Sequence, residues 1–457
     1  MLRTSQILTY PTRKNTFENF SCGSPDEKER SRKEFKMTKR EIFEDIVQIM
    51  KEDSASCKDK TGEAPDRYLE KITEDMEDME FLYLVNSYLN TFELTGHLAF
   101  SKKGVGGVGF GVQRYENVLY VTSTSKDVAL KTGDKIIRVD GLEICDYEEK
   151  HKSFLFGETQ ERQAPHWMYL LKYAKNITYV SGEDGKEYCC DMKTGFFESQ
   201  EEKYVCRDLG NGIVFIRFAD FEEEEKIQRM YDENAELLKN SRVLIVDVRG
   251  NGGGSDTCFL PLLQYALPNG KKMDEIELVD ESANSGGSEI NYSVRNCDTR
   301  LKGFEQYLQM ELPEETRAIL LGMRDELLAN RGKGFVKNQN GETVIPIVGD
   351  SKVEKMYIIT DSGCASSGDN FVAVFQMFSK VTVFGRPTMG ILDYSNVAFA
   401  EYGDFYLMYP TSRLLSVDKG NGMMKKGVKV DHYIPWTPEH LRRDVDLETV
   451  LEEYATC

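Results

Sequence analysis

The sequence predicts a multidomain α/β protein with a helical N-terminal domain, a small β domain and a larger α/β core. The first observation is length, because 457 residues correspond to roughly three domains of about 150 residues each. The second is that apolar residues recur at helical spacing over residues 42–50. The third is that short apolar strands alternate with helical stretches after Gly212, a rhythm typical of a mainly parallel sheet covered by helices.

Charge and composition argue against nucleic acid as a partner and against a membrane-spanning helix. The chain carries 58 Lys and Arg against 77 Asp and Glu, which leaves a formal net charge of −19. Such a charge repels phosphate backbones, so nucleic acid is not an expected partner. Apolar runs are short, as at Val243–Val246, whereas a membrane-spanning helix needs about 18 consecutive apolar residues. We therefore expect no membrane span.

The first residues of the chain and its cysteines bear on the cellular compartment of the protein. Residues 1–36 are polar and mixed in charge, which predicts a flexible lead-in. The first twenty residues lack the basic start and apolar stretch of an export signal. The ten cysteines show no CxxC pair and no zinc-ligand spacing, which favours reduced thiols and predicts no metal site. These features predict a cytoplasmic protein, although a chain from which a signal had been removed would look similar.

Residues 37–100 predict the helical N-terminal domain. Thr38 and Glu41 have the spacing of a capping box, and the apolar residues over 42–50 then follow one helical face. A second helical stretch is expected after Pro65. Together these segments predict a small helical domain.

Residues 101–150 predict the small β domain. They contain the sequence GVGGVGFGV from Gly104, the alternating strand Leu119–Ser123 and the turn segment GDKIIRVDG at Gly133–Gly141. This order of glycine loop, strands and turn resembles a PDZ-like domain, a fold that binds extended peptides at an exposed sheet edge. The alternative is a small β domain with a structural role only.

Residues 151–457 predict the α/β core, with an insertion around residues 271–350. The expected strands are Ile213–Phe218, Arg242–Val248, Met356–Thr360 and Val381–Phe384, and the expected helices are Glu222–Lys239, Thr257–Tyr265 and Ser367–Phe378. The insertion carries many charges and few strand signals, and it indicates a helix around Pro313–Arg331.

A glycine-rich turn follows the buried strand within Leu244–Gly254. Glycines let backbone N–H groups approach an anion, and a helix N-terminus adds a partial positive charge. The turn lacks the lysine of a nucleotide-binding P-loop, because Ser255 and Asp256 follow the glycines. The segment therefore suits a phosphate or a transient oxyanion. A tight turn without any ligand is the alternative.

A second turn of small residues, TDSGCASSGD, spans Thr360–Asp369 between a strand and an apolar helix. Such a turn exposes a hydroxyl and aims helix amides at the atom it attacks, which is the geometry that nucleophilic serines use. The alternative is that Ser366 or Ser367 only caps the helix.

The ordered set of motifs resembles the S41 peptidases, which include the C-terminal processing (tail-specific) proteases and the tricorn core. The set comprises VLIVDVRGNGGGS, YIITDSGCASSGDNFVAVFQ, VTVFGRPTMG and GMMKKGVKVDHYI, and the resemblance covers about residues 80–450. It implies a ClpP/crotonase-like α/β protease core, serine endopeptidase chemistry and a peptide or polypeptide substrate. It implies no metal and no organic cofactor.

The resemblance also implies which serine is the nucleophile. Counting back from the family segment at Gly385–Gly390 places it on Ser366, with Ser362 and Ser367 as the other candidates. In the processing proteases a lysine directly after that segment is the general base. This chain has Ile391 there, so a base other than that lysine is required.

The tricorn-like branch uses a histidine that precedes the PDZ-like domain, and His97 has that placement. His432, which follows a family turn, is the rival candidate. The remaining histidines lie in segments without a motif; they are His151, His166 and His440.

The third member of the catalytic site and the oxyanion donors are the remaining residues to be assigned. A histidine base needs a partner that fixes its tautomer, and Asp369 and Asp431 are both possible third members. N–H groups near Gly252, Gly253 and Ser367 are the expected oxyanion donors.

These residues predict a serine endopeptidase in which Ser366 attacks the peptide carbonyl and His97 accepts its proton. The alternative is a peptide-binding or scaffold protein on the same fold whose catalysis has decayed. Its grounds are that the family lysine is missing and that the glutamate which the tricorn branch has near its C-terminal Gly-Val motif has no counterpart in the sequence MMKKGV at Met423–Val428. The oligomeric state does not follow from the sequence.

Overall fold

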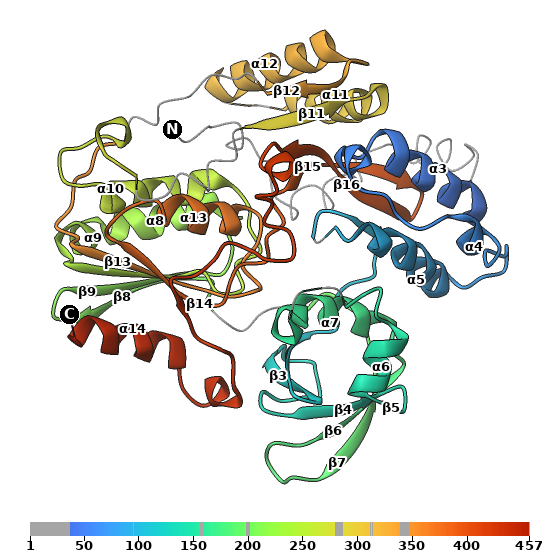
Figure 1. Cartoon of the computed structure of the whole chain (residues 1–457), viewed down its shortest axis with the longest axis horizontal. Coiled ribbons are helices and arrows are strands. Elements are labelled where there is room, and N and C mark those ends of the chain that lie inside the picture. The colour runs from blue at the N-terminus through green and yellow to red at the C-terminus, as the bar shows by residue number, and fades with distance from the viewer. Residues whose placement is uncertain are drawn as a thin grey trace.

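The computed structural model describes residues 37–94, 96–155, 157, 159–197, 202–278, 287–310, 312, 314–338 and 347–456 (Figure 1). The lead-in predicted over residues 1–36 lies outside this part of the chain. Within it, the strands form three sheets, and helices pack beside them. The predicted mixture of helices and sheets is confirmed.

The α/β core is built on a six-stranded sheet with the order β17-β14-β13-β10-β9-β8. The strands are β8 (Tyr204–Gly210), β9 (Ile213–Phe218), β10 (Val243–Asp247), β13 (Lys355–Thr360), β14 (Val381–Gly385) and β17 (His432–Tyr433). Neighbouring strands are parallel except for β8, which runs antiparallel to β9. The expected parallel sheet is confirmed. Because β10 and β13 are adjacent, the turns that follow them meet at one edge of the sheet.

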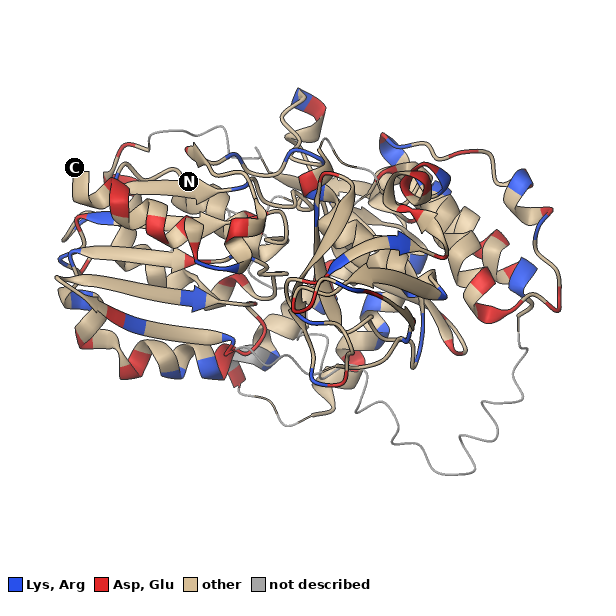
Figure 2. Ribbon diagram, turned by 90° about the horizontal axis from the view of Figure 1, so that it is seen from below, with Lys and Arg blue, Asp and Glu red and all other residues tan. Residues whose placement is uncertain are grey.

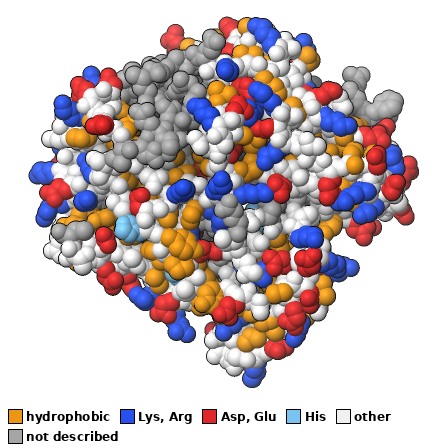
Figure 3. Space-filling model, viewed as in Figure 1, with side chains coloured by type: hydrophobic (Ala, Val, Ile, Leu, Met, Phe, Trp, Pro, Cys, Tyr) orange, Lys and Arg blue, Asp and Glu red, His pale blue; other side chains and the backbone are white. Residues whose placement is uncertain are grey.

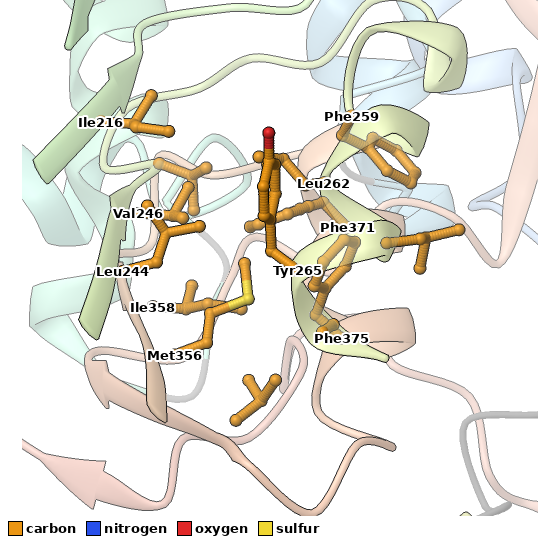
Figure 4. Close-up of a cluster of buried hydrophobic side chains, with 14 of the residues drawn as sticks. Ile216, Leu244, Val246, Phe259, Leu262, Tyr265, Met356, Ile358, Phe371 and Phe375 are labelled. Carbon is orange, nitrogen blue, oxygen red and sulfur yellow. The ribbon is translucent and has the colours of Figure 1, made fainter. Parts of the chain in front are cut away.

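Helices cover both faces of this sheet (Figure 1). They are α8 (Glu224–Glu233), α9 (Ala235–Asn240), α10 (Leu263–Ala266), α13 (Ser367–Phe375) and α14 (Val445–Thr456). Figure 4 shows Leu244 and Val246 of β10 within one buried cluster with Phe371 and Phe375 of α13. The apolar face of α13 is therefore anchored on the sheet, and this holds its N-terminus in place. On the opposite face, Val450 of α14 belongs to a separate buried cluster.

Two expected helices of the core differ from the prediction. The stretch Glu222–Lys239 forms two helices, because Asn234 leaves helical geometry and its side chain donates to the Met230 carbonyl at 2.8 Å. The stretch Thr257–Tyr265 begins as 3₁₀ turns before the short α10. Pro261 lies in these turns and has no backbone N–H for an α-helical hydrogen bond.

The N-terminal helices pack on a second sheet. This sheet has the order β1-β16-β11-β12, with β15 paired to β16. Its strands are β1 (Ala99–Lys102), β11 (Ser288–Tyr292), β12 (Gly334–Lys337), β15 (Tyr394–Tyr402) and β16 (Phe405–Leu414), and the helices beside it are α3 (Lys39–Glu52), α4 (Asp66–Leu69) and α5 (Asp78–Leu89). The capping box of α3 is confirmed, since Thr38 Oγ1 accepts the Glu41 N–H at 3.2 Å and the Thr38 N–H donates to Glu41 Oε2 at 2.7 Å.

The predicted insertion contributes strands to this second sheet. β11 and β12 pair with each other, and β11 also pairs with β16. Between them, α11 (Val294–Leu308) and α12 (Glu314–Asn330) form a helical pair, and α12 lies where a helix was predicted. The strand signals of β11 and β12 are weak in the sequence because these strands are stabilised by partners distant in the chain.

The third sheet belongs to the small β domain and has the order β2-β3-β4-β6-β7, with β5 paired to β4. Its elements are β2 (Phe110–Tyr115), β3 (Val118–Thr124), β4 (Lys135–Val139), β5 (Leu142–Glu143), α6 (Ile144–Lys150), α7 (Ala164–Leu170), β6 (Asn176–Val180) and β7 (Glu187–Asp191). The predicted strand Leu119–Ser123 lies within β3. The sheet extends beyond residue 150, the predicted end of this domain, because β6 pairs with β4 and Trp167 of α7 lies in the same core.

Acidic and basic residues are interspersed along the helices and strands drawn in Figure 2. Figure 3 shows the same mixture on one face of the molecule, together with a hydrophobic patch among the charged groups. None of the helices in the described ranges is both long enough and apolar enough to cross a membrane.

Candidate active site

Ser366 occupies a strained turn between β13 and α13. Its backbone has φ 56° and ψ −119°, in a region that a serine rarely adopts, and it is the residue that precedes the first turn of α13. Such a conformation costs about 1–3 kcal/mol and persists only where the surroundings enforce it. The Ser366 N–H donates to Asp369 Oδ2 at 2.8 Å. Ser366 is half-buried, whereas Ala365 and Ser367 on either side of it in the chain are buried.

The neighbouring nucleophile candidates have other roles in the structure. Ser367 is buried, and its hydroxyl donates to the Gly254 carbonyl at 2.7 Å. Ser362 is buried as well. Cys364 is completely buried, and this burial raises the pKa of its thiol well above the ordinary value, which keeps it protonated and unreactive. Ser366 is thus the candidate of this turn that combines partial exposure with strained geometry.

The glycine-rich turn after β10 lies directly against Ser366. A Cβ placed on Gly253 would lie 2.6 Å from the Cβ of Ser366 and 3.0 Å from the Ser367 nitrogen. Gly253 also has φ +98°, a conformation that favours glycine. The two turns that the sequence singled out are therefore packed against each other, and only glycine allows this approach.

Asn251 joins these two turns. Its backbone carbonyl accepts the Ala365 N–H at 2.8 Å, and its side-chain Oδ1 accepts the Gly253 N–H at 2.9 Å. Asn251 is completely buried, so these bonds are shielded from water. The Gly253 amide, one of the expected oxyanion donors, is consequently engaged by Asn251 in this conformation.

Of the other two expected donors, one lies in the glycine-rich turn and the other follows Ser366 in the chain. Gly252 is exposed in the turn after β10. Ser367 is the first residue of α13, where backbone N–H groups have no partner within the helix and the helix dipole favours negative charge. Gly252 and Ser367 therefore remain candidate oxyanion donors.

Asp369, a candidate third member, binds backbone amides with both of its oxygens. Oδ1 accepts the Gly390 N–H at 2.7 Å, and Oδ2 accepts the N–H groups of Ile391 and Ser366 at 3.0 and 2.8 Å. The carboxyl is completely buried, and desolvation raises its pKa to about 6. Asp369 therefore ties the serine turn to the loop that follows β14.

His97 lies on the short segment between the N-terminal helices and β1. Its Nδ1 is 2.6 Å from the Tyr394 carbonyl oxygen. A carbonyl oxygen can only accept, so Nδ1 carries the hydrogen and donates it. The neutral ring then has its lone pair on Nε2. This is the tautomer that a general base requires.

The His97 segment packs on the same loop that Asp369 holds. A Cβ placed on Gly96 would lie 2.7 Å from Cδ1 of Ile391, and the Ile391 amide shares Asp369 Oδ2 with the Ser366 amide. Tyr394, which binds His97, comes three residues later. One short stretch, residues 391–394, thus contacts both the nucleophile turn and the segment of the candidate base.

The rival histidine has a different environment. His432 is exposed on β17 and stacks on Phe384, with 4.4 Å between ring centroids. His151 hydrogen-bonds the Tyr83 hydroxyl through Nδ1 at 2.8 Å, and His440 lies beside Asp446 with Nε2 3.3 Å from Oδ1. Burial and the nearby Arg162 charge lower the pKa of His166 to about 4.

Asp431, the other candidate third member, stabilises the sheet. Its Oδ2 accepts the Val383 N–H at 2.8 Å, and its Oδ1 accepts from the Gln376 side chain at 3.2 Å. His97 Nδ1 instead hydrogen-bonds to the Tyr394 carbonyl.

Arg162 of the small β domain contacts the loop after β14. Its guanidinium donates to three consecutive backbone carbonyls, those of residues 387–389, at 3.0, 2.7 and 3.1 Å. This loop leads directly to Gly390 and Ile391. The small β domain is therefore joined to the segment that positions Ser366.

The sequence interpretation did not identify Asn251, Arg162 or the Tyr394 carbonyl. Asn251 stands inside the motif RGNGGG, and a polar residue between glycines was a usable signal. Arg162 and Tyr394 stand in segments without a recognised motif, and a backbone carbonyl carries no residue-type signal. Among the residues that the structure describes, no group of three or more His, Cys, Asp and Glu side chains is arranged to hold a metal ion.

Comparisons with known proteins bear on the family and the fold of this chain. Residues 212–434 match the family described as peptidase family S41. The solved structure of mature CPAF is similar to this chain with a TM-score of 0.59 and 12% sequence identity, over 89% of this chain and 94% of that chain. Mature CPAF complexed with lactacystin is similar with the same TM-score and identity, over 91% of this chain and 97% of that chain. No curated protein sequence matches the chain. At this identity the structural likeness concerns the fold.

Proposed function

We propose that this chain, which belongs to peptidase family S41 through its residues 212–434, is a serine endopeptidase with Ser366 as nucleophile and His97 as base. The observation that carries the proposal is the convergence of three features. Ser366 has strained nucleophile geometry, the glycine turn closes on it, and His97 Nδ1 is bound to the Tyr394 carbonyl. A serine hydroxyl is a weak nucleophile unless a base and oxyanion donors converge on it.

In the first half of the reaction, Ser366 Oγ attacks the carbonyl carbon of the scissile peptide bond. Its proton moves to His97 Nε2, which gives it to the leaving amine as the C–N bond breaks. The Tyr394 carbonyl keeps Nδ1 protonated and orients the ring throughout. In the second half, a water molecule gives a proton to Nε2 and attacks the acyl carbon, and the proton returns to Ser366.

The amides of Ser367 and Gly252 are the proposed donors to the oxyanion. Ser367 adds the positive end of the α13 dipole. The Gly253 amide joins them only if it leaves Asn251 Oδ1, to which it donates at 2.9 Å. Gly253 itself contributes by its lack of a side chain, which makes room for Ser366.

The substrate is proposed to be a peptide or an unfolded polypeptide tail. An extended segment is the form in which peptides pair with exposed sheet edges. The small β domain, which resembles a PDZ-like domain in sequence, is joined to the loop at residues 387–389 by Arg162 and is proposed to guide such a substrate to the site.

The test combines active-site labelling with a digest of a peptide library. A fluorophosphonate probe is expected to label Ser366 in the wild type, and Ser366→Ala is expected to abolish both labelling and cleavage. Cys364→Ala is the matched control, because its thiol lies two residues away and is completely buried, so both activities should persist. Lactacystin, which is bound in the CPAF complex, serves as a second probe.

The outcomes separate the alternatives. Cleavage that survives in Ser366→Ala and is lost in Cys364→Ala assigns the nucleophile to the cysteine. A folded wild type that neither labels nor cleaves any peptide supports the decayed scaffold instead.

A further inference from the structure

We propose that Ile391 is the positioning residue that sets the separation between the nucleophile turn and the base segment. This inference rests on the proposed function, because it concerns the geometry of Ser366 and His97. Its basis is that the backbone of Ile391 contacts one of these segments through Asp369, and its side chain contacts the other.

The carboxyl group of Asp369 binds the backbone of Ile391. Its Oδ2 accepts the Ile391 N–H at 3.0 Å and the Ser366 N–H at 2.8 Å, while Oδ1 accepts the Gly390 N–H at 2.7 Å. The carboxyl group is completely buried, so water does not compete for these bonds. The backbone of Ile391 is therefore fixed relative to the backbone of Ser366.

The side chain of Ile391 contacts the segment that carries His97. Ile391 is only 7% exposed, and a Cβ placed on Gly96 would lie 2.7 Å from its Cδ1 and 3.0 Å from its Cγ2. Gly96 is thus seated directly on the isoleucine side chain. His97 follows Gly96, and its ring is bound to the carbonyl of Tyr394, three residues after Ile391.

Shape explains why this position suits isoleucine. Both branches of the side chain, Cγ2 and Cδ1, face Gly96, so a residue that lacks either branch leaves space beneath the His97 segment. A lysine is unbranched at Cβ and lacks Cγ2, and its ammonium is costly to bury without a partner. We therefore expect that Ile391→Lys displaces the His97 segment and does not create a working lysine base.

The experiment compares truncations of two buried isoleucines. Ile391→Ala removes the proposed support, and Ile213→Ala removes the same atoms at 9% exposure on β9, in the cluster that packs toward α14. We expect Ile391→Ala to lower kcat about 10- to 100-fold with KM within about twofold, since a displacement of about 1 Å in a catalytic group has effects of this size. Ile213→Ala is expected to lower Tm about as much as Ile391→Ala does. It is expected to keep kcat within about twofold of wild type.

A second readout separates positioning from substrate binding. The rate of fluorophosphonate labelling of Ser366 depends on the nucleophile and its base, so it is expected to fall in Ile391→Ala together with kcat. Ile391→Val keeps Cγ2 but loses Cδ1, the atom nearest to a Cβ placed on Gly96, so its labelling rate is expected to fall below that of the wild type and to stay above that of Ile391→Ala. This variant also serves if Ile391→Ala does not fold.

The results distinguish the two proposals. If the wild type labels and cleaves but Ile391→Ala loses no more kcat than Ile213→Ala, the positioning role is wrong and the proposed function stands. If Ile391→Lys is as active as wild type, the positioning role is also wrong. If the folded wild type neither labels nor cleaves, the proposed function fails and the role of Ile391 fails with it.

Discussion

Lys425 Nζ lies 2.6 Å from Glu93 Oε2, and this ion pair joins the loop at residues 423–427 to the segment that precedes His97. Both residues have positive φ, 66° for Lys425 and 55° for Glu93, although neither is a glycine. Because both residues of the ion pair have strained backbones, the surrounding structure must hold both of these segments in place. The pair therefore connects the N-terminal helices to the α/β core near the candidate base.

Exchange of the two charges tests whether the Glu93–Lys425 pair supports the His97 segment. Glu93→Gln and Lys425→Gln are each expected to lower kcat about two- to fivefold, because a half-exposed ion pair contributes about 0.2–1 kcal/mol. The double variant Glu93→Lys with Lys425→Glu restores the attraction and should recover activity. Steady-state kinetics at low and high salt measure the effect, which salt should weaken in the wild type. Equal activity of all variants would contradict the prediction.

The pH dependence of cleavage tests His97 as the base. A histidine with an ordinary pKa of about 6.5 must be neutral to accept a proton, so kcat/KM should rise with pH through an apparent pKa between about 6 and 8. His97→Ala is expected to lose this activity. His432→Ala is the control, because the exposed His432 stacks on Phe384, and its kinetics should match wild type. Full activity in His97→Ala would assign the base elsewhere.

Two substitutions at Gly252 separate the effect of losing its N–H group from the effect of adding a side chain. No atom lies within 4 Å of a Cβ placed on Gly252, so Gly252→Ala should fold and keep its N–H and its activity. Gly252→Pro removes the N–H. Loss of one oxyanion donor is expected to lower kcat by a factor of about 10²–10³. Circular dichroism shows whether both variants fold, and an equal kcat for the two would remove this amide from the mechanism.

Gly253→Ala tests the close approach of the two turns. A Cβ there would lie 2.6 Å from Ser366 Cβ, so the serine turn must shift, and φ +98° adds strain. We expect a loss of kcat greater than tenfold, with the Gly252→Ala variant as the matched control. Retention of wild-type kcat in Gly253→Ala would show that the serine position does not depend on this contact.

The buried carboxyl group of Asp256 is expected to make the unfolding free energy depend on pH. Desolvation raises its pKa from 3.8 to about 6, and its Oδ2 accepts from the Asn370 side chain at 2.8 Å. The folded protein therefore binds a proton that the unfolded chain has lost between about pH 4 and 6. The contribution to the unfolding free energy is present below about pH 4 and falls by about 2–3 kcal/mol as the pH rises through 6.

Urea denaturation of Asp256→Asn at several pH values measures this contribution. The variant cannot titrate, so its unfolding free energy should fall less between pH 4 and 7 than that of the wild type. Asp274→Asn, at an exposed position, is the control and should follow the wild-type pH dependence. A parallel pH dependence in wild type and Asp256→Asn would show that Asp256 does not titrate in this range.

Much of the fold follows from consecutive residues. β9 matches the predicted strand Ile213–Phe218, and β13 and β14 each include one residue more than predicted. The capping box at Thr38 is equally local. Helix interruptions at Asn234 and the 3₁₀ turns at Pro261 were not predicted, because apolar periodicity continues through both positions while side-chain and proline chemistry interrupts the backbone hydrogen bonds.

What the sequence by itself determined is the order of its motifs, the candidates Ser366 and His97, and the absence of the family lysine at Ile391. Only the tertiary structure decided that Asn251 holds the Gly253 amide, that Asp369 binds backbone amides, and that the Tyr394 carbonyl orients His97. His97 and Tyr394 are separated by 297 residues in the chain. Contacts of this kind depend on how distant segments pack, and backbone groups that take part in them are the same for every residue type, so a single sequence carries no signal for them.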